Sequence, residues 1–137
     1  MKVKIKYKDI LAKGLFADEF IPKNNIVLYL KGNYFPKPSR TSIQVGKDKH
    51  IESYEGGFIN HHCDSNAEIR IHEDFIGRNL SNRTQPSLVA LVVAKKDILE
   101  GEEITFDYET TETELAEPFK CDCHGNWIRG KHYRYQE

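Results

Sequence analysis

The stretch FINHHCDSNAEI, residues 58–69, holds two adjacent histidines and a cysteine between Asn60 and Asn66. Zinc in proteins usually takes four ligands in tetrahedral geometry, whereas neighbouring side chains on an extended chain point to opposite faces. His61 and His62 are therefore a poor pair of ligands for one ion. Cys63, taken alone, fits a small buried apolar residue. The stretch alone leaves a metal site, a catalytic pocket and an ordinary turn open.

A second stretch, GEEITFDYE at residues 101–109, is a turn followed by a short strand. The alternation of Ile104, Phe106 and Tyr108 predicts one face of a strand packed on a core. Asp107 and Tyr108 come where this strand ends, and functional side chains are common in such positions. Packing alone explains the pattern equally well, so this stretch by itself does not identify a function either.

Length and composition restrict the class of protein. A chain of 137 residues forms one domain with a modest core. The apolar fraction of 39% and charged fraction of 30% are typical of a soluble globular protein. A net charge of −1 gives no global field that would attract nucleic acid or an anionic membrane, and we expect neither as a partner. No apolar stretch approaches the roughly 20 residues needed to cross a bilayer.

The N-terminus and the cysteines bear on location. The first ten residues, MKVKIKYKDI, alternate charge and apolarity and contain no apolar signal-peptide core. The three cysteines are an odd number, and Cys121 and Cys123 are only two positions apart. A disulfide framework is therefore not expected, and reduced thiols fit the cytosol. We expect a cytoplasmic protein, with secretion as an effector by a route without a cleaved signal as the alternative.

Periodicity predicts a mainly β chain with little helix. Apolar residues alternate with lysines over residues 3–8, and β-branched or alternating runs predict the further strands, at residues 26–30, 68–76, 87–98 and 104–108. Residues 32–57 are the least regular segment, with a short strand expected at 42–46. Residues 110–119 alone favour a short helix, which Pro118 would end.

Four motifs together give a family resemblance. They are AKGLFA at 12–17, FINHHCDSNAEI at 58–69, LVVAKKDILEGEEITFDY at 91–108 and FKCDCHGNWIRG at 119–130. Their order and spacing resemble the SET-domain family of protein lysine methyltransferases over most of the chain. The two central motifs are close to the family patterns F-I-N-H-S-C-x-P-N-A and G-E-E-L-T-F-D-Y. The combination is specific, although each motif alone is weak.

The resemblance implies a SET-domain β-clip fold of short strands with a C-terminal pseudoknot. Residues 1–117 would form the SET domain, with a variable, substrate-selecting insert at about 32–57, and residues 118–137 a post-SET-like tail. It also implies methyl transfer from S-adenosylmethionine, bound on one face, to a lysine that enters a narrow channel from the opposite face. The partner would be a protein with an accessible lysine, a histone or another; a homo-oligomer is compatible with the sequence.

The resemblance assigns roles to individual residues. Tyr108 matches the catalytic tyrosine, and Phe106 matches the position that sets how many methyl groups fit. Phenylalanine there implies di- or trimethylation. The positions that would bind the cofactor are Lys13, Gly14, Leu15, Phe16, Asn60, His61, Tyr108, Phe119 and Trp127. Phe58, Phe106 and Tyr108 would line the lysine channel.

The chain departs from the family pattern in the tail. Many members bind zinc through three tail cysteines and the cysteine of the N-H-S-C motif, but Ile128 occupies the third tail position here. We therefore expect apolar packing of the tail rather than zinc. If zinc is present, the expected ligands are Cys63, Cys121, Cys123 and His124. Two alternatives to an enzyme remain: a catalytically inactive SET-fold binding module, and a small zinc-stabilised interaction domain.

Overall fold

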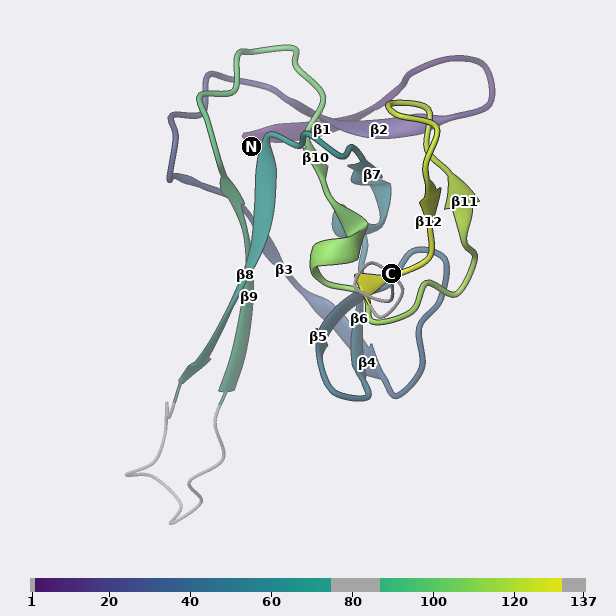
Figure 1. Cartoon of the computed structure of the whole chain (residues 1–137). Coiled ribbons are helices and arrows are strands. Elements are labelled where there is room, and N and C mark those ends of the chain that lie inside the picture. Colours follow the sequence, from purple (N-terminus) through teal and green to yellow (C-terminus); the bar gives the residue numbers. More distant parts are fainter. Residues whose placement is uncertain (1, 75–86, 132–137) are drawn as a thin grey trace.

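The structure is a computed structural model that describes residues 2–74 and 87–131 (Figure 1). In these residues the chain forms twelve short strands, grouped in five small sheets, and two 3₁₀ turns. The prediction of a mainly β fold is confirmed. The sheets surround one apolar core in which Leu15, Ile51, Ile59, Val92 and Ile104 are fully buried.

The N-terminal hairpin places the first motif. Strand β1 (Val3–Tyr7) pairs antiparallel with β2 (Lys13–Ala17), so that Val3 lies opposite Ala17. The turn between them is held by Asp9, whose Oδ1 accepts the N–H groups of Leu11 at 2.8 Å and Ala12 at 2.9 Å. Val3 and Ala17 enter the core while the intervening lysines of β1 stay in solvent, as the period-2 pattern predicts.

A three-stranded antiparallel sheet contains the two longest strands of the described chain. Its order is β3 (Ile26–Leu30), β9 (Ser87–Ala94) and β8 (Ala67–Asp74), as Figure 1 shows. The central strand β9 contributes Ala90, Val92 and Ala94 to the core, which agrees with its nearly continuous apolar run.

The insert at residues 32–57 is more regular than its sequence indicates. It forms a second three-stranded sheet in the order β4 (Gly32–Phe35), β6 (Lys49–Ser53) and β5 (Ile43–Gly46). Strand β5 confirms the prediction at 42–46. Strands β4 and β6 were missed, and for β4 the reason is that all four of its residues are exposed, which leaves no apolar alternation.

Two very short strands join distant parts of the chain. Strand β7 (Asn60–His61), which follows the 3₁₀ turn η1 (Gly56–Phe58), runs parallel to β10 (Thr105–Phe106). Thr105 lies opposite Asn60 and Phe106 opposite His61. This parallel pairing is the meeting of the two central motifs that the pseudoknot prediction required.

The helix expected at 110–119 is wrong. The only helical residues there are the 3₁₀ turn η2 (Tyr108–Thr110), and the rest is irregular. Tertiary hydrogen bonds replace the helical ones: the Glu112 carboxylate accepts the Gln44 N–H at 2.7 Å, and the Leu115 N–H donates to the Arg129 carbonyl at 2.8 Å. These partners outweigh a helix propensity that is weak over so few residues.

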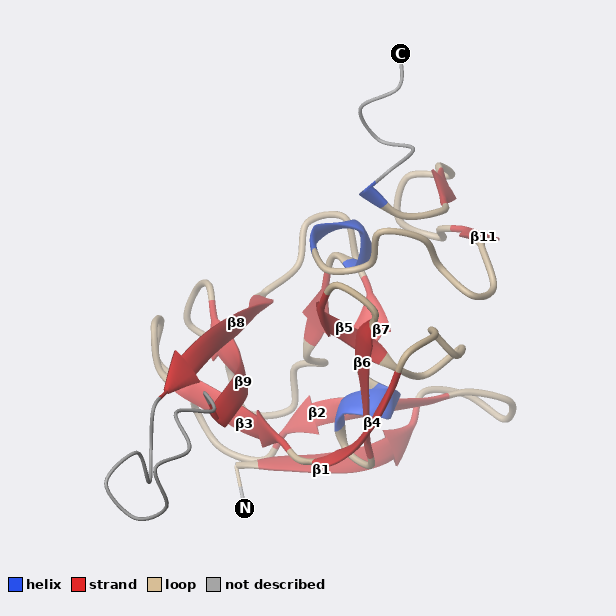
Figure 2. Ribbon diagram, turned by 90° about the horizontal axis from the view of Figure 1, so that it is seen from below, coloured by secondary structure: helices blue, strands red, loops and turns tan. Residues whose placement is uncertain are grey.

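The tail forms a small hairpin at one edge of the molecule in Figure 2. Strand β11 (Phe119–Lys120) pairs with β12 (Trp127–Ile128), and Ile128 is fully buried. Glu109 fixes the end of the hairpin, because its Oε2 accepts the N–H groups of Arg129 at 3.1 Å and Gly130 at 3.0 Å.

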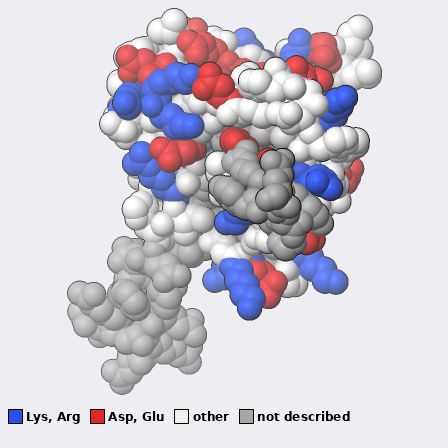
Figure 3. Space-filling model, in the orientation of Figure 1, with Lys and Arg blue, Asp and Glu red and all other residues white. Residues whose placement is uncertain are grey.

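The surface agrees with the mixed composition. In Figure 3 basic and acidic side chains are interspersed over the described part of the visible face, without a large area of one sign. In residues 2–74 and 87–131, no helix is both long and apolar enough to cross a membrane.

Candidate functional site

Tyr108 lies at the end of the β7–β10 pair, where the two central motifs meet. Its hydroxyl donates to the Ile59 carbonyl at 2.6 Å, and its backbone N–H donates to His61 Nδ1 at 3.1 Å. Burial, reinforced by the charge of Glu112 and partly opposed by Arg40, raises the pKa of Tyr108 well above its ordinary 10. The phenol is therefore neutral at physiological pH and keeps the proton that it donates.

Asn60 ties the central motif to the N-terminal hairpin. Its Nδ2 donates to the Lys13 carbonyl at 3.0 Å and to Glu103 Oε2 at 2.7 Å. Lys8 Nζ lies 3.0 Å from the other oxygen of the Glu103 carboxylate. The result is a cluster of oxygen acceptors, a carbonyl and a carboxylate, beside the asparagine. Such a set favours the ammonium group of an amino-acid ligand over an anion.

Gly14 explains how the first motif approaches so closely. A Cβ at this position would lie 2.6 Å from Glu103 Oε2 and 3.2 Å from Asn60 Nδ2. A side chain would therefore separate β2 from the acceptor cluster. Leu15 points into the core, and the ring of Phe16 lies under Lys6 Nζ, 4.6 Å from the ring centre. The motif consequently offers backbone groups rather than side chains to the site.

Asn66, the second asparagine of the opening stretch, is structural. Its Oδ1 accepts the Thr105 N–H at 3.0 Å and its Nδ2 donates to the Glu103 carbonyl at 2.8 Å. Asn66 thereby fixes the entry to β10 and the position of Glu103.

A cavity of about 340 Å³ opens at Tyr108. Asn60, Phe106 and Phe119 also line it, from β7, β10 and β11. The remaining walls come from the insert (residues 39–43), from the glycines of η1 and the residue after it, and from Glu112 and residues 115–118. The other predicted residues are not part of this lining: Lys13, Gly14, Leu15, Phe16, Phe58, His61 and Trp127. Phe58 packs edge-on against Tyr54, with 5.5 Å between ring centres, and Trp127 is 63% exposed.

The insert and the segment after Tyr108 are joined by a reciprocal pair of hydrogen bonds. The Gln44 backbone N–H donates to the Glu112 carboxylate at 2.7 Å, and Gln44 Oε1 accepts the Thr113 N–H at 2.7 Å. Burial raises the pKa of Glu112, although the bonds from Gln44 and Thr111 oppose this shift. Sequence reasoning missed Glu109 and Glu112, because polar residues in a Thr/Glu-rich segment are expected to be exposed. It also missed Gln44, a polar residue of the short strand at 43–46.

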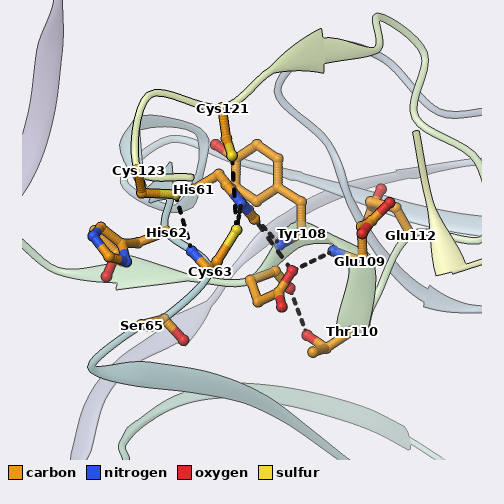
Figure 4. A network of polar contacts seen from close by, with 12 residues as sticks. His61, His62, Cys63, Ser65, Tyr108, Glu109, Thr110, Glu112, Cys121 and Cys123 are labelled. Carbon is orange, nitrogen blue, oxygen red and sulfur yellow. Dashed lines mark hydrogen bonds and ion pairs between the residues drawn. The ribbon is translucent and has the colours of Figure 1, made fainter. Parts of the chain in front are cut away.

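The three cysteines gather next to His61. Cys63 Sγ lies 3.8 Å from Cys121 Sγ and 3.3 Å from His61 Nε2, as Figure 4 shows beside Tyr108. The ligand atoms of His61, Cys63, Cys121 and Cys123 all lie within 4.8 Å of one another. Three thiols and an imidazole at this separation fit a tetrahedral zinc site. His124, the fourth donor expected from sequence, lies against His62 instead, with ring centres 6.3 Å apart.

The thiols have unequal proton affinities. Burial, together with hydrogen bonds to Cys123 and Cys121, raises the pKa of Cys63 to about 12. Burial alone would also raise the pKa of Cys121, but backbone N–H groups of His124 and Asn126 and the neighbouring thiols lower it to about 7. Cys121 therefore carries negative charge much more readily than Cys63 does.

Comparisons with known proteins identify a family that matches most of the chain. The family model of the SET domain matches residues 12–109. A protein of Caenorhabditis elegans named "Probable histone-lysine N-methyltransferase set-23" is 31% identical over 105 residues, which is 77% of this chain and 38% of that protein. The "Histone-lysine N-methyltransferase, H3 lysine-4 specific" of Schizosaccharomyces pombe is 29% identical over 85% of this chain and 14% of its own length.

A solved structure supports the fold. The crystal structure of a candidate histone methyltransferase of Plasmodium falciparum superposes with a TM-score of 0.60 at 24% identity, covering 78% of this chain and 92% of that one. The chain spans less than two fifths of the length of the curated relatives described above. The match to the SET-domain model covers most of the chain and includes Asn60, His61 and Tyr108. This chain therefore belongs to the SET-domain family.

Proposed function

We propose that the protein transfers methyl groups from S-adenosylmethionine to the side-chain amine of lysine in a protein substrate. The observation that supports this most directly is the β7–β10 pairing, which brings Asn60 and Tyr108 to one cavity and His61 into contact with Tyr108. The names of the matched relatives, which describe histone-lysine methyltransferases, point to the same reaction. A histone or another protein with an accessible lysine is the proposed substrate.

The proposed cofactor site uses the acceptor cluster around Asn60. S-adenosylmethionine, when bound, supplies a methyl group activated on a sulfonium. The Lys13 carbonyl, the Glu103 carboxylate and Asn60 itself would hold its amino-acid part, with the backbone of residues 13–16 alongside. Phe119 reaches the cavity and is the better candidate to cover the adenine, since Trp127 is largely exposed.

The channel must also deliver a neutral amine. A free lysine titrates near 10.4, so deprotonating it at pH 7 costs about 4–5 kcal/mol. Apolar walls such as Phe106 lower this cost by disfavouring the charged ammonium. Tyr108, which stays protonated and is oriented by the Ile59 carbonyl, would align the amine for in-line attack.

Phe106 supports transfer of more than one methyl group. Its ring is 4.9 Å from that of Tyr108, centre to centre, and it lines the same cavity without a hydroxyl. A phenylalanine leaves the space that a tyrosine hydroxyl and its bound water would fill. We propose that a methylated amine can rotate there, which permits di- and trimethylation.

The insert and tail are proposed to choose the substrate. Residues 39–43 of the insert, residues 115–117, and Pro118 and Phe119 of the tail line the cavity. We keep the division into a SET domain at 1–117 and a tail from 118 as part of this proposal. Exchanging the insert for that of a relative is expected to change the preferred peptide.

Transfer of a labelled methyl group from S-adenosylmethionine to histones and to lysate proteins tests the proposal. Tyr108→Phe should lower kcat/KM on the order of 10²–10³-fold, the usual effect of losing one positioned donor. Tyr54→Phe is the matched control, because Tyr54 is 72% exposed and should behave like the unmodified protein. Cofactor binding without transfer to any protein would favour an inactive module, and equal rates for Tyr108→Phe and the unmodified chain would refute Tyr108 as the catalytic tyrosine.

A further inference from the structure

The thiol cluster has separations close to those of a zinc site, with His61 of β7 as the fourth donor. On one tetrahedral zinc, two thiolates lie about 3.8 Å apart, and a thiolate and an imidazole nitrogen about 3.5 Å apart. The corresponding separations here are 3.8 Å for Cys63 and Cys121 and 3.3 Å for Cys63 and His61 Nε2. Cys63 thus lies at tetrahedral separations from Cys121 and close to them from His61, and all four donor atoms lie within 4.8 Å of one another.

The backbone around the cysteines supports the same interpretation. The Asn126 N–H donates to Cys121 Sγ at 3.3 Å, and the Cys63 N–H donates to Cys123 Sγ at 3.4 Å. Gly125 closes a tight turn at φ +70°, with its N–H donating to the Cys121 carbonyl at 3.0 Å. Amide N–H groups directed at sulfur stabilise thiolates, which are the form that binds metal.

The usual fourth cysteine has no counterpart in this cluster. Ile128 occupies that position of the motif, and it is fully buried opposite Phe119 in the tail hairpin. His124 is exposed and follows Cys123 directly, which makes it an awkward partner for the same ion. His61 approaches the sulfurs instead, from β7.

We propose that His61 is the fourth ligand of a zinc site completed by Cys63, Cys121 and Cys123. One histidine then serves two sites, since its Nε2 faces the sulfurs and its Nδ1 faces the backbone of Tyr108. This goes beyond the proposed methyl transfer, because it joins the tail to the reaction cavity through a single ring. It also replaces His124, the donor expected from sequence.

The second nitrogen explains how the two sites are coupled. Nδ1 accepts the Tyr108 N–H at 3.1 Å and lies 3.8 Å from Asp107 Oδ1. A neutral imidazole that binds metal through Nε2 carries its proton on Nδ1, and such a proton usually donates to a carboxylate. Zinc binding would therefore turn Nδ1 from Tyr108 toward Asp107. The hydrogen bond from the Tyr108 N–H to His61 Nδ1 would therefore be present without zinc and lost when zinc binds.

Metal content and X-ray absorption of the full chain, purified without chelator and equilibrated with zinc, test the proposal. The expected result is one zinc per chain, with three sulfurs at about 2.3 Å and one nitrogen at about 2.0 Å. His61→Ala should remove the nitrogen and weaken zinc binding on the order of 100-fold in competition with a chromogenic chelator. The matched controls His62→Ala and His124→Ala should leave both readouts unchanged.

Asp107→Asn provides a second test in case His61→Ala does not fold. Asparagine keeps the side-chain oxygen that caps Glu109 at 3.0 Å but is no longer a carboxylate, so zinc affinity should fall about 10–100-fold. The proposal is overturned by protein that takes up no zinc, by another metal in the same test, or by loss of the nitrogen in His124→Ala alone. These measurements need no substrate, so the two proposals can fail separately. Protein that takes up no zinc and still methylates would refute the zinc site and leave the proposed methyl transfer standing.

Discussion

Removing the Glu109 carboxylate should detach the tail. Glu109 is buried, and its Oε2 holds the backbone N–H groups of Arg129 and Gly130. Gly130 has a φ of +129°, and a Cβ there would lie 2.3 Å from the Thr113 carbonyl, so the tail passes very close to this segment. Glu109→Ala leaves both amides without their acceptor at a crowded contact.

The structure sets the size of the effect. A hydrogen bond to a charged group contributes about 1.5–3 kcal/mol, so two give about 3–6 kcal/mol. The upper value is an overestimate, because the tail can undock and return its amides to water. We expect the free energy of opening the tail to fall by about 3 kcal/mol, which is roughly a 150-fold increase in the open population.

Amide hydrogen exchange measures this opening. The best probes are the N–H groups of Leu115, bonded to the Arg129 carbonyl, and Lys131, bonded to the Glu112 carbonyl, both at 2.8 Å. Their exchange should accelerate about 100-fold or more in Glu109→Ala, while amides of the β8–β9 pair keep their protection. Glu114→Ala, on the exposed side of the same segment, is the control. Protection unchanged within a factor of two at Leu115 and Lys131 would refute the reasoning.

Three further outcomes are expected. Glu112→Gln should become more stable than the unmodified chain as pH rises. The raised pKa of Glu112 stabilises the folded protein below about pH 4.5, and this contribution is lost as pH rises through the raised pKa. Glutamine does not titrate, so the melting temperatures of the two proteins should agree at pH 4 and diverge by pH 8. Gly14→Ala should displace Glu103 from Asn60 and weaken cofactor binding in calorimetry, with a small change in melting temperature. Phe106→Tyr should confine products to monomethyl-lysine in mass spectrometry; trimethyl-lysine from this variant would contradict the proposed role.

Local pattern predicted the strands with clear alternation but not the contacts that build the site. Strands β7 and β10 are two residues each, too short for any periodicity, and their pairing followed only from the resemblance of whole motifs. Glu109 and Glu112 could not be predicted because the amides that they accept, at Gly130 and Gln44, lie far away in sequence. Burial of a carboxylate by distant partners leaves no local signal.

The tail cysteines illustrate a similar limit. Adjacency in sequence made His124 the obvious companion of Cys123, but adjacent side chains seldom converge. The fold brings His61 of β7 to the sulfurs of Cys63, Cys121 and Cys123 although the tail cysteines are about 60 positions away in sequence. Motif order indicated the three cysteines that lie together, and only the three-dimensional arrangement showed that His61 lies beside them.

The threading of β7 against β10 has a consequence for biogenesis. A nascent chain that has reached only Asp74 contains Asn60 and His61 but lacks the strand that must lie beside them. Such a product cannot assemble a pocket, so truncated translation products should be inert. Closing this long-range contact also costs loop entropy late in folding, which predicts slow, all-or-none acquisition of activity. The protein should then become competent only after β10 has left the ribosome and paired with β7.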